Sequence, residues 1–287
     1  ILIGKDTRQS GDMLEAALAA GLCSVGADVE TLGVLPTPAV AYLVTKYKAD
    51  AGVVISASHN PMEFNGIKVF ASTGYKLPDE VEARIEAHID NNCKDIPLAT
   101  GAGVGQVSFR ADGIRDYVDH LYESIDGDLT GLNVCIDCAN GAAAAVAQKL
   151  FPRLGAKCTF LGVTPDGQNI NDGVGSTHLE KLEKEVVEGG FDCGIAFDGD
   201  ADRCLACDEK GREMDGDKII ALLSLMMKEQ GKLDADTAVV TVMSNLGFMK
   251  FMESQGIRTE KTAVGDRYVL ENMRENGYAI GGEQSGH

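Results

Sequence analysis

Short apolar runs alternate along the chain with segments in which apolar residues recur every three or four positions. Continuous apolar runs are typical of strands buried in a parallel sheet, and the wider spacing is typical of amphipathic helices. An order of strand, helix, glycine turn and strand occurs three times, with the turns at Gly26, Gly155 and Gly256. The copies are spaced like domains rather than like solenoid repeats. Each copy predicts one β-α-β unit.

Further segments extend these units. Pro78 directly precedes a segment with Val81, Ile85 and Ile89 on one helical face, so it predicts an amphipathic helix. The expected strands cover 1–4, 29–33, 51–56, 106–109, 133–138, 157–162, 193–197, 205–208, 238–243 and 258–263. The other expected helices cover about 13–25, 114–125, 142–154 and 246–255. The pattern predicts an α/β protein of successive, topologically similar α/β/α domains with mixed, mostly parallel sheets.

Charge narrows the classes of partner. The 287 residues include 44 Asp and Glu against 26 Lys and Arg, a formal net charge of −18. This balance repels nucleic acids and anionic lipid, so neither a nucleic-acid nor a membrane partner is expected. The hydrophobic content of 44% excludes disorder as the main state. No apolar run is long enough to span a bilayer and no secretory signal is visible, which predicts a cytoplasmic protein.

The cysteines suggest a zinc-binding site as an alternative. Cys135 and Cys138 are spaced as C-x-x-C, and so are Cys204 and Cys207, among eight cysteines in all. Both pairs fall in expected strands, where residues three apart point to opposite faces. Neither spacer contains the glycine or proline that a zinc-binding turn favours. We therefore expect reduced thiols that serve largely as small core residues.

The segment Ser56–Pro61 directly follows the expected strand 51–55, where sites in open α/β sheets are found. A serine next to a histidine is a candidate nucleophile, because a hydroxyl needs an activating base. An Asn-Pro turn with a capping serine is the simpler alternative. The segment that follows brings Lys68 back to the same end of the sheet. Its positive charge favours a phosphate-binding loop there.

A second polar loop follows the strand 193–197. Asp198, Asp200 and Asp202 alternate with small residues, as a hard cation such as Mg²⁺ or Ca²⁺ requires. An EF-hand loop is the rival, but Arg203 occupies the position that needs glycine and the flanks are strand-like. Arg203 also offers an anion contact.

Three more strand-end loops carry polar groups. The segment 281–287, with Glu283, Ser285 and His287, suits recognition of sugar hydroxyls, although it also fits an ordinary polar loop. Residues 4–8 end in Arg8 and either bind an anion or cap the next helix. Gly265, Asp266 and Arg267 form a similar loop. Because all these loops follow strands of parallel units, we expect them to face one cleft.

Taken together, these motifs closely resemble the α-D-phosphohexomutase superfamily and, within it, the bacterial phosphoglucosamine mutases. The resemblance implies that Ser58 carries the phosphoryl group and that Asp198, Asp200 and Asp202, with Ser58, hold Mg²⁺. It implies contacts of Arg8, Arg203 and His59 with the transferred group, and sugar recognition by Glu283 and Ser285. The loop 265–267 is expected to bind substrate. Lys68, with a lowered pKa, and His287 are the expected general acid and base.

The implied reaction interconverts glucosamine 6-phosphate and glucosamine 1-phosphate through a phosphoserine and a bisphosphate, and it feeds UDP-N-acetylglucosamine synthesis. Gln284 favours the glucosamine branch. Glucose or mannose specificity, a calcium-binding module and a non-catalytic sugar-phosphate sensor remain open, as does a homodimer.

The resemblance also predicts a domain organisation. A phosphoserine-loop domain would cover 1–108, a metal-loop domain 109–209 and a sugar-loop domain 210–287. The family's glycine-rich opening segment and its fourth, phosphate-binding domain have no counterpart in the sequence, so we expect a fragment with an incomplete first domain.

Overall fold

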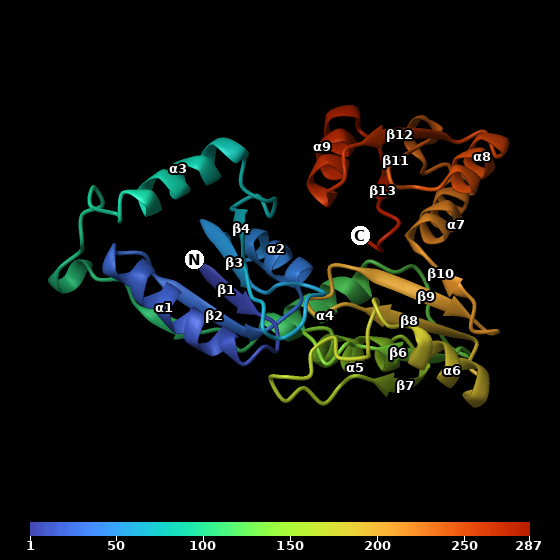
Figure 1. Ribbon diagram of the computed structural model, residues 1–287, viewed down its shortest axis with the longest axis horizontal. Coiled ribbons are helices and arrows are strands. Elements are labelled where there is room, and N and C mark those ends of the chain that lie inside the picture. The colour runs from blue at the N-terminus through green and yellow to red at the C-terminus, as the bar shows by residue number, and fades with distance from the viewer. The chain divides into compact units, whose positions relative to one another are not determined.

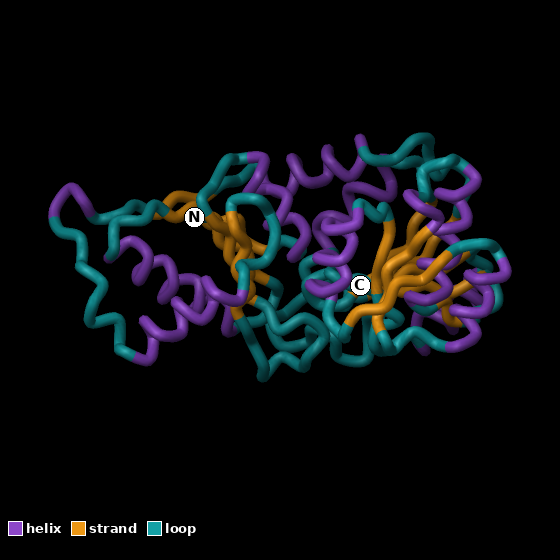
Figure 2. Tube along the Cα trace, turned by 90° about the horizontal axis from the view of Figure 1, so that it is seen from above, coloured by secondary structure: helices purple, strands orange, loops and turns teal.

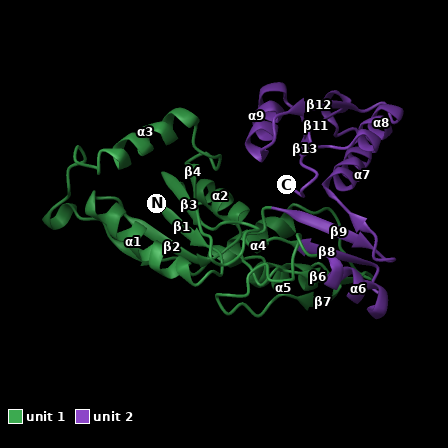
Figure 3. Ribbon diagram, in the orientation of Figure 1, with its two compact units in different colours: residues 1–178, 197–202 green, residues 179–196, 203–287 purple.

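Strands and helices alternate along most of the chain (Figures 1 and 2). The computed structural model describes residues 1–287 and divides them into two compact units (Figure 3). Unit 1 comprises residues 1–178 and 197–202, and unit 2 comprises residues 179–196 and 203–287. The three glycine turns are confirmed, since Gly26, Gly155 and Gly256 have φ angles of 90°, 88° and 66°. Such positive φ angles favour glycine.

The first sheet lies in unit 1 and has the strand order β4-β3-β1-β2-β5. Its members are β1 (Leu2–Lys5), β2 (Val29–Val34), β3 (Ala51–Ile55), β4 (Ile67–Ala71) and β5 (Val107–Phe109). All neighbours pair in parallel except β3 and β4, which are antiparallel. Because β1 and β3 are adjacent and parallel, their carboxyl ends lie side by side at the same end of the sheet.

Two helices cover opposite faces of this sheet. Val40 and Leu43 of α2 (Thr37–Lys46) pack in one core with strand residues such as Val54, and Cys23 of α1 (Ser10–Ser24) packs in another with Ile55. A Cβ atom at Gly4 would lie only 2.5 Å from a methyl group of Val40. Glycine at this position thus lets α2 approach β1 closely.

The remaining strands form two sheets. One has the order β10-β9-β8-β6-β7, with β6 (Asn133–Asp137), β7 (Lys157–Leu161), β8 (Cys193–Phe197), β9 (Cys204–Asp208) and β10 (Glu213–Met214). The third, in unit 2, has the order β12-β11-β13, with β11 (Thr237–Thr241), β12 (Arg258–Thr262) and β13 (Ile280–Gly282) paired in parallel. Mixed, mostly parallel sheets are confirmed.

The other helices are α3 (Asp79–Asp90), α4 (Gly113–Glu123), α5 (Ala144–Arg153), α6 (Glu180–Gly189), α7 (Gly216–Glu229), α8 (Leu246–Ser254) and α9 (Asp266–Asn276). Short 3-10 turns cover Gly101–Gly103 and Asp234–Asp236. Helix α3 begins after Pro78 as predicted, but its apolar face is not buried, since Ile85 and Ile89 are 41% and 61% exposed. The sequence pattern predicted no element for α2, α6, α7, α9, β4, β10 or β13.

All eight cysteines are free thiols, as expected, and four of them are buried. Burial raises the pKa of the Cys138 thiol to about 12 and, together with nearby acidic groups, that of Cys207 to about 11. None of the helices combines the length and the apolar character that crossing a bilayer requires. The predicted domain boundaries remain predictions.

Candidate active site

The site in unit 1 starts where β1 and β3 end next to each other. Ser56 follows β3, and its Oγ donates to Asp6 Oδ2, after β1, at 2.6 Å. Ser56 Oγ also accepts from the backbone N–H of Ser58 at 2.9 Å. Burial raises the pKa of the Asp6 carboxyl, against the lowering effect of its bonds with Ser56 and Arg8. These contacts fix on the sheet the beginning of the segment 56–64, which we call the serine loop.

Ser58 has a left-handed backbone with a φ angle of 54°. This conformation costs a non-glycine residue about 1–2 kcal/mol, so surrounding contacts must maintain it. The Oγ atom donates to Asp198 Oδ2 at 2.5 Å and lies 3.4 Å from His59 Nδ1. The predicted phosphoryl-carrying serine and Asp198, the first aspartate of the acidic loop 198–202, are therefore neighbours, although 140 positions separate them.

The acidic loop directly follows β8, as predicted. Asp198 and Asp200 are fully buried, and Asp202 is partly buried. The loop has no room at Gly199, where a Cβ atom would lie 2.6 Å from the carbonyl oxygen of Ser58. Strands β8 and β9 flank the loop, so the EF-hand alternative, which needs helices on both sides, is wrong.

The three carboxylates fit a hard cation. Each offers one oxygen, and these oxygens all lie within 4.8 Å of one another. Asp200 Oδ1 is buried without a hydrogen-bond partner. A buried carboxylate oxygen without a partner is costly, and a divalent cation with oxygen ligands would satisfy it. The donor set of this cluster therefore fits a metal-binding site.

Lys68 lies on β4, opposite Val54 of β3. Its Nζ is 2.6 Å from both Asp200 Oδ2 and Asp202 Oδ2. Burial opposes the lysine charge, but the two carboxylates outweigh it and raise the pKa of the Lys68 ammonium. The prediction of a lowered pKa was wrong, because the neighbours of Lys68 are anions rather than other cations.

Arg8 has other partners than the sequence suggested. Its side chain is fully buried and its Nε donates to Asp6 Oδ2 at 2.8 Å. The two Nη atoms donate to four backbone carbonyl oxygens of the serine loop, those of Ser58, Asn60, Pro61 and Phe64. An arginine side chain has five N–H donors, and these five hydrogen bonds use all of them. These contacts do not favour the predicted contact of Arg8 with a transferred phosphoryl group.

The remaining predicted residues belong to unit 2. Glu283 is buried, and its Oε1 accepts from the backbone N–H of Gly265 at 2.8 Å, so the loops after β12 and β13 meet. Ser285 Oγ lies 3.5 Å from Glu283 Oε2, and the carbonyl of His287 accepts from the backbone N–H of Glu283. Asp266 and Arg267 open α9. Their roles, and that of Arg203, remain predictions.

Sequence reasoning missed two polar side chains that touch the site. Thr37, at the start of α2, donates through Oγ1 to Asp200 Oδ2, and its backbone N–H donates to the Asp200 carbonyl. Asn171 donates through Nδ2 to the carbonyl oxygens of Ser58 and Asn60. Asn171 lies in the long loop after β7, and its place after a strand was the one available signal.

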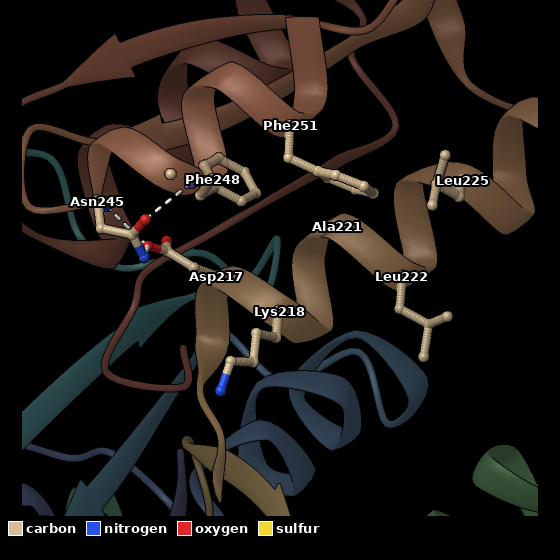
Figure 4. A pocket seen from close by; sticks show the side chains of 9 residues that line it. Asp217, Lys218, Ala221, Leu222, Leu225, Asn245, Phe248 and Phe251 are labelled. Atoms are coloured by element: carbon tan, nitrogen blue, oxygen red, sulfur yellow. Dashed lines mark hydrogen bonds between the residues drawn. The ribbon is translucent and has the colours of Figure 1, made fainter. Parts of the chain in front are cut away.

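Unit 2 also contains an apolar groove of about 420 Å³ between α7 and α8 (Figure 4). Leu222, Leu225, Phe248 and Phe251 contribute its apolar lining. The carboxylate of Asp217 turns toward Asn245, accepting from its backbone and side-chain nitrogens at 2.8 and 2.9 Å. This carboxylate joins the first turns of the two helices.

Models of one protein family match three successive parts of the chain. The models describe α/β/α domains I, II and III of phosphoglucomutase/phosphomannomutase, and they match residues 1–95, 115–211 and 215–287. The chain belongs to this family.

Along its whole length, the chain is similar in sequence to phosphoglucosamine mutases. It is 58% identical over 287 residues to a phosphoglucosamine mutase of Acetivibrio thermocellus, and 57% identical to one of Clostridium botulinum. The match covers 100% of the chain and 64% of each relative. The chain thus spans just under two thirds of the length of these relatives.

Solved structures show the same fold. A family protein from Burkholderia thailandensis matches 100% of the chain and 62% of its own with a TM-score of 0.83 at 24% identity. An Aspergillus fumigatus N-acetylphosphoglucosamine mutase, solved with GlcNAc-6P and magnesium, matches 94% of the chain and 65% of its own with a TM-score of 0.61 at 21% identity. At these identities the likeness concerns the fold alone.

Proposed function

We propose that the protein to which this chain belongs is a phosphoglucosamine mutase, which interconverts glucosamine 6-phosphate and glucosamine 1-phosphate. The contact between Ser58 Oγ and Asp198 Oδ2, beside the carboxylates of Asp200 and Asp202, carries the proposal. It puts a hydroxyl that can carry a phosphoryl group next to a donor set for a divalent cation. The identity of 58% to a phosphoglucosamine mutase supports the choice of sugar.

The proposed reaction has two matching halves. Phosphorylated Ser58 gives its phosphoryl group to O1 of glucosamine 6-phosphate: the bond from phosphorus to Oγ breaks and a bond to O1 forms. The O1 proton leaves to a base and Oγ gains a proton, which yields glucosamine 1,6-bisphosphate. After this intermediate reorients, O6 returns its phosphoryl group to Ser58, and glucosamine 1-phosphate is released.

Asp198, Asp200 and Asp202, together with a phosphoserine oxygen, would hold Mg²⁺. A bound Mg²⁺ would neutralise charge that develops on the phosphoryl oxygens. Mg²⁺ prefers oxygen ligands, and the three carboxylates supply them. That a distant relative was solved with magnesium is consistent with the assignment.

The protein's own residues supply positioning and proton transfer. Lys68, held as an ammonium by two carboxylates, suits charge neutralisation or proton donation better than proton abstraction. His59 would contact the phosphoryl group on Ser58, since its Nδ1 is near Oγ. Arg203, Glu283, Ser285 and the loop 265–267 are the candidates for substrate binding, and His287 is a candidate base. A homodimer remains a prediction.

The proposal can be tested on the intact protein that contains this chain. Intact mass with and without phosphatase should detect one phosphoryl group on the wild type and on a Ser254→Ala control, whose hydroxyl donates only within α8. The Ser58→Ala variant should lack this group and lose turnover by about 10³-fold or more. Phosphoryl uptake and turnover by the Ser58→Ala variant would show that Ser58 is not the carrier.

Specificity needs a separate measurement. We expect kcat/KM for glucosamine 6-phosphate to exceed the values for glucose 6-phosphate and mannose 6-phosphate by at least about tenfold. A preference for either of the other two sugars would instead support a phosphoglucomutase or phosphomannomutase.

A further inference from the structure

The left-handed backbone at Ser58 raises the question of what holds it. The loop has turns of its own, since the backbone N–H of Asn60 donates to the carbonyl of Ala57 and that of Phe64 to the carbonyl of Pro61. These local bonds leave the carbonyl oxygens of Ser58 and Asn60 for other donors. Both carbonyls lie in a half-buried part of the site, where unpaired backbone groups are costly.

Each of these two carbonyl oxygens accepts two hydrogen bonds, one from each of two distant residues. Arg8 Nη2 lies 2.9 Å from Ser58 O and 2.8 Å from Asn60 O. Asn171 Nδ2 lies 2.9 Å from Ser58 O and 3.1 Å from Asn60 O. Arg8 follows β1, whereas Asn171 lies in the loop after β7, so two separate segments bind the same pair of carbonyls.

Both donors are themselves fixed. Arg8 is buried and paired with Asp6. Asn171 is buried, and its backbone N–H donates to the carbonyl of Ala139 in the loop after β6 at 2.9 Å. The orientation of the Asn171 amide follows from chemistry, because the carbonyl oxygens it faces can only accept. The amide nitrogen must therefore point to the serine loop.

We propose that Asn171 is a positioning residue that, together with Arg8, clamps the carbonyls of Ser58 and Asn60 and so aims Ser58 Oγ at Asp198. The expected effect of Asn171 on turnover rests on the proposed function, whereas its expected effect on the serine loop does not. The side-chain amide of Asn171 donates to two backbone carbonyl oxygens of the loop. Its loss should lower kcat rather than raise KM, since a displaced reacting group slows the chemical step.

The test compares Asn171→Ala, Asn171→Asp and Asn169→Ala in the intact protein, after thermal unfolding has shown which variants are folded. Asn169 is a matched control: it belongs to the same loop, and its side-chain amide bonds only to Asp166 and Thr164 within that loop. In Asn171→Asp, a carboxylate oxygen would face the two carbonyl oxygens, so repulsion replaces attraction. This variant keeps the side-chain volume and serves alone if Asn171→Ala does not fold.

Hydrogen exchange of the peptide 56–64 reports on the loop without any substrate. We expect about tenfold faster exchange in Asn171→Ala, which loses two hydrogen bonds, and at least as large an effect in Asn171→Asp. With glucosamine 6-phosphate, kcat should fall about 10- to 100-fold with KM nearly unchanged. Asn169→Ala should match the wild type in both measurements.

The outcomes separate the two proposals. Wild-type exchange in peptide 56–64 of the folded Asn171 variants would overturn the clamp, and so would a milder effect of Asn171→Asp than of Asn171→Ala. If the loop responds as expected but the wild type turns over no phosphosugar, the clamp stands and the proposed function fails.

Discussion

Lys68 Nζ lies 2.6 Å from Oδ2 of Asp200, a carboxylate of the candidate metal site. A divalent ion and this ammonium would both draw on the carboxylates of Asp200 and Asp202. Replacing Lys68 by methionine removes the competing charge, and we expect the apparent affinity for Mg²⁺ to rise about tenfold, or about 1.4 kcal/mol. Isothermal titration without substrate measures this. Lys68→Arg is the control that retains the charge, and an unchanged affinity in Lys68→Met would mean that lysine and metal do not compete.

Asp200→Asn tests the acidic loop directly. The substitution keeps the shape of the side chain but removes a charge from a donor set that gains its affinity from charge. Binding of Mg²⁺ should weaken by at least about tenfold, with a parallel loss of turnover. Asp172→Asn, an exposed aspartate of unit 1, should bind Mg²⁺ like the wild type. Equal affinity in Asp200→Asn and the wild type would remove Asp200 from the metal site.

Thr37 connects the first turn of α2 with the acidic loop. Thr37→Val keeps the volume but deletes the hydroxyl that donates to Asp200. We expect the free energy of unfolding to fall by about 1–2 kcal/mol, because the hydrogen bond involves a buried carboxylate. Thr37→Ser retains the donor and should lose less. Urea unfolding of both variants distinguishes a lost hydrogen bond from lost packing, which would make Thr37→Ser the less stable of the two.

Tyr117 should make the stability of the folded protein depend on pH in the alkaline range. Burial raises the pKa of its hydroxyl from 10.0 to about 12. Between these values the unfolded chain loses the proton while the folded protein keeps it. The stabilisation is therefore complete below pH 10 and is lost as the pH rises through about 12, by up to about 3 kcal/mol.

Tyr117→Phe lacks the ionising hydroxyl. The wild type should lose stability relative to Tyr117→Phe on going from about pH 9 to about pH 11 in urea unfolding, because only its unfolded state releases this proton. Tyr268→Phe, at an exposed tyrosine, should follow the wild type. Parallel curves for the wild type and Tyr117→Phe would contradict the raised pKa.

The predictable part of the fold depended on periodic patterns. The three β-α-β copies were found because each has a short apolar strand, a helical repeat and a glycine turn, and the turn glycines do have positive φ angles. Helix α2 was not found, because Ala39–Val44 is nearly all apolar and such a run has no helical period to detect. Packing against β1 and β3, which no local pattern contains, decides its structure.

The site was predictable where residue type alone determines chemistry. Ser58 and the three aspartates occupy strand-end loops and carry the expected groups, and the structure brings Ser58 and Asp198 together. The charge environment of Lys68 was not predictable, since its pKa depends on Asp200 and Asp202, more than 130 positions away. The contacts of Asn171 with the serine loop likewise arise from long-range packing.

Helix α3, which has no buried residue, spans the connection between β4 and β5 at opposite edges of the first sheet. A helix with so little buried surface can open at low cost while the strands on either side stay hydrogen-bonded. Cleavage of the backbone there would leave one piece with β1 to β4 and another whose first strand is β5, which pairs with β2. The connection is thus a natural place to split the gene, because the two products would retain the complementary edges through which they could reassemble.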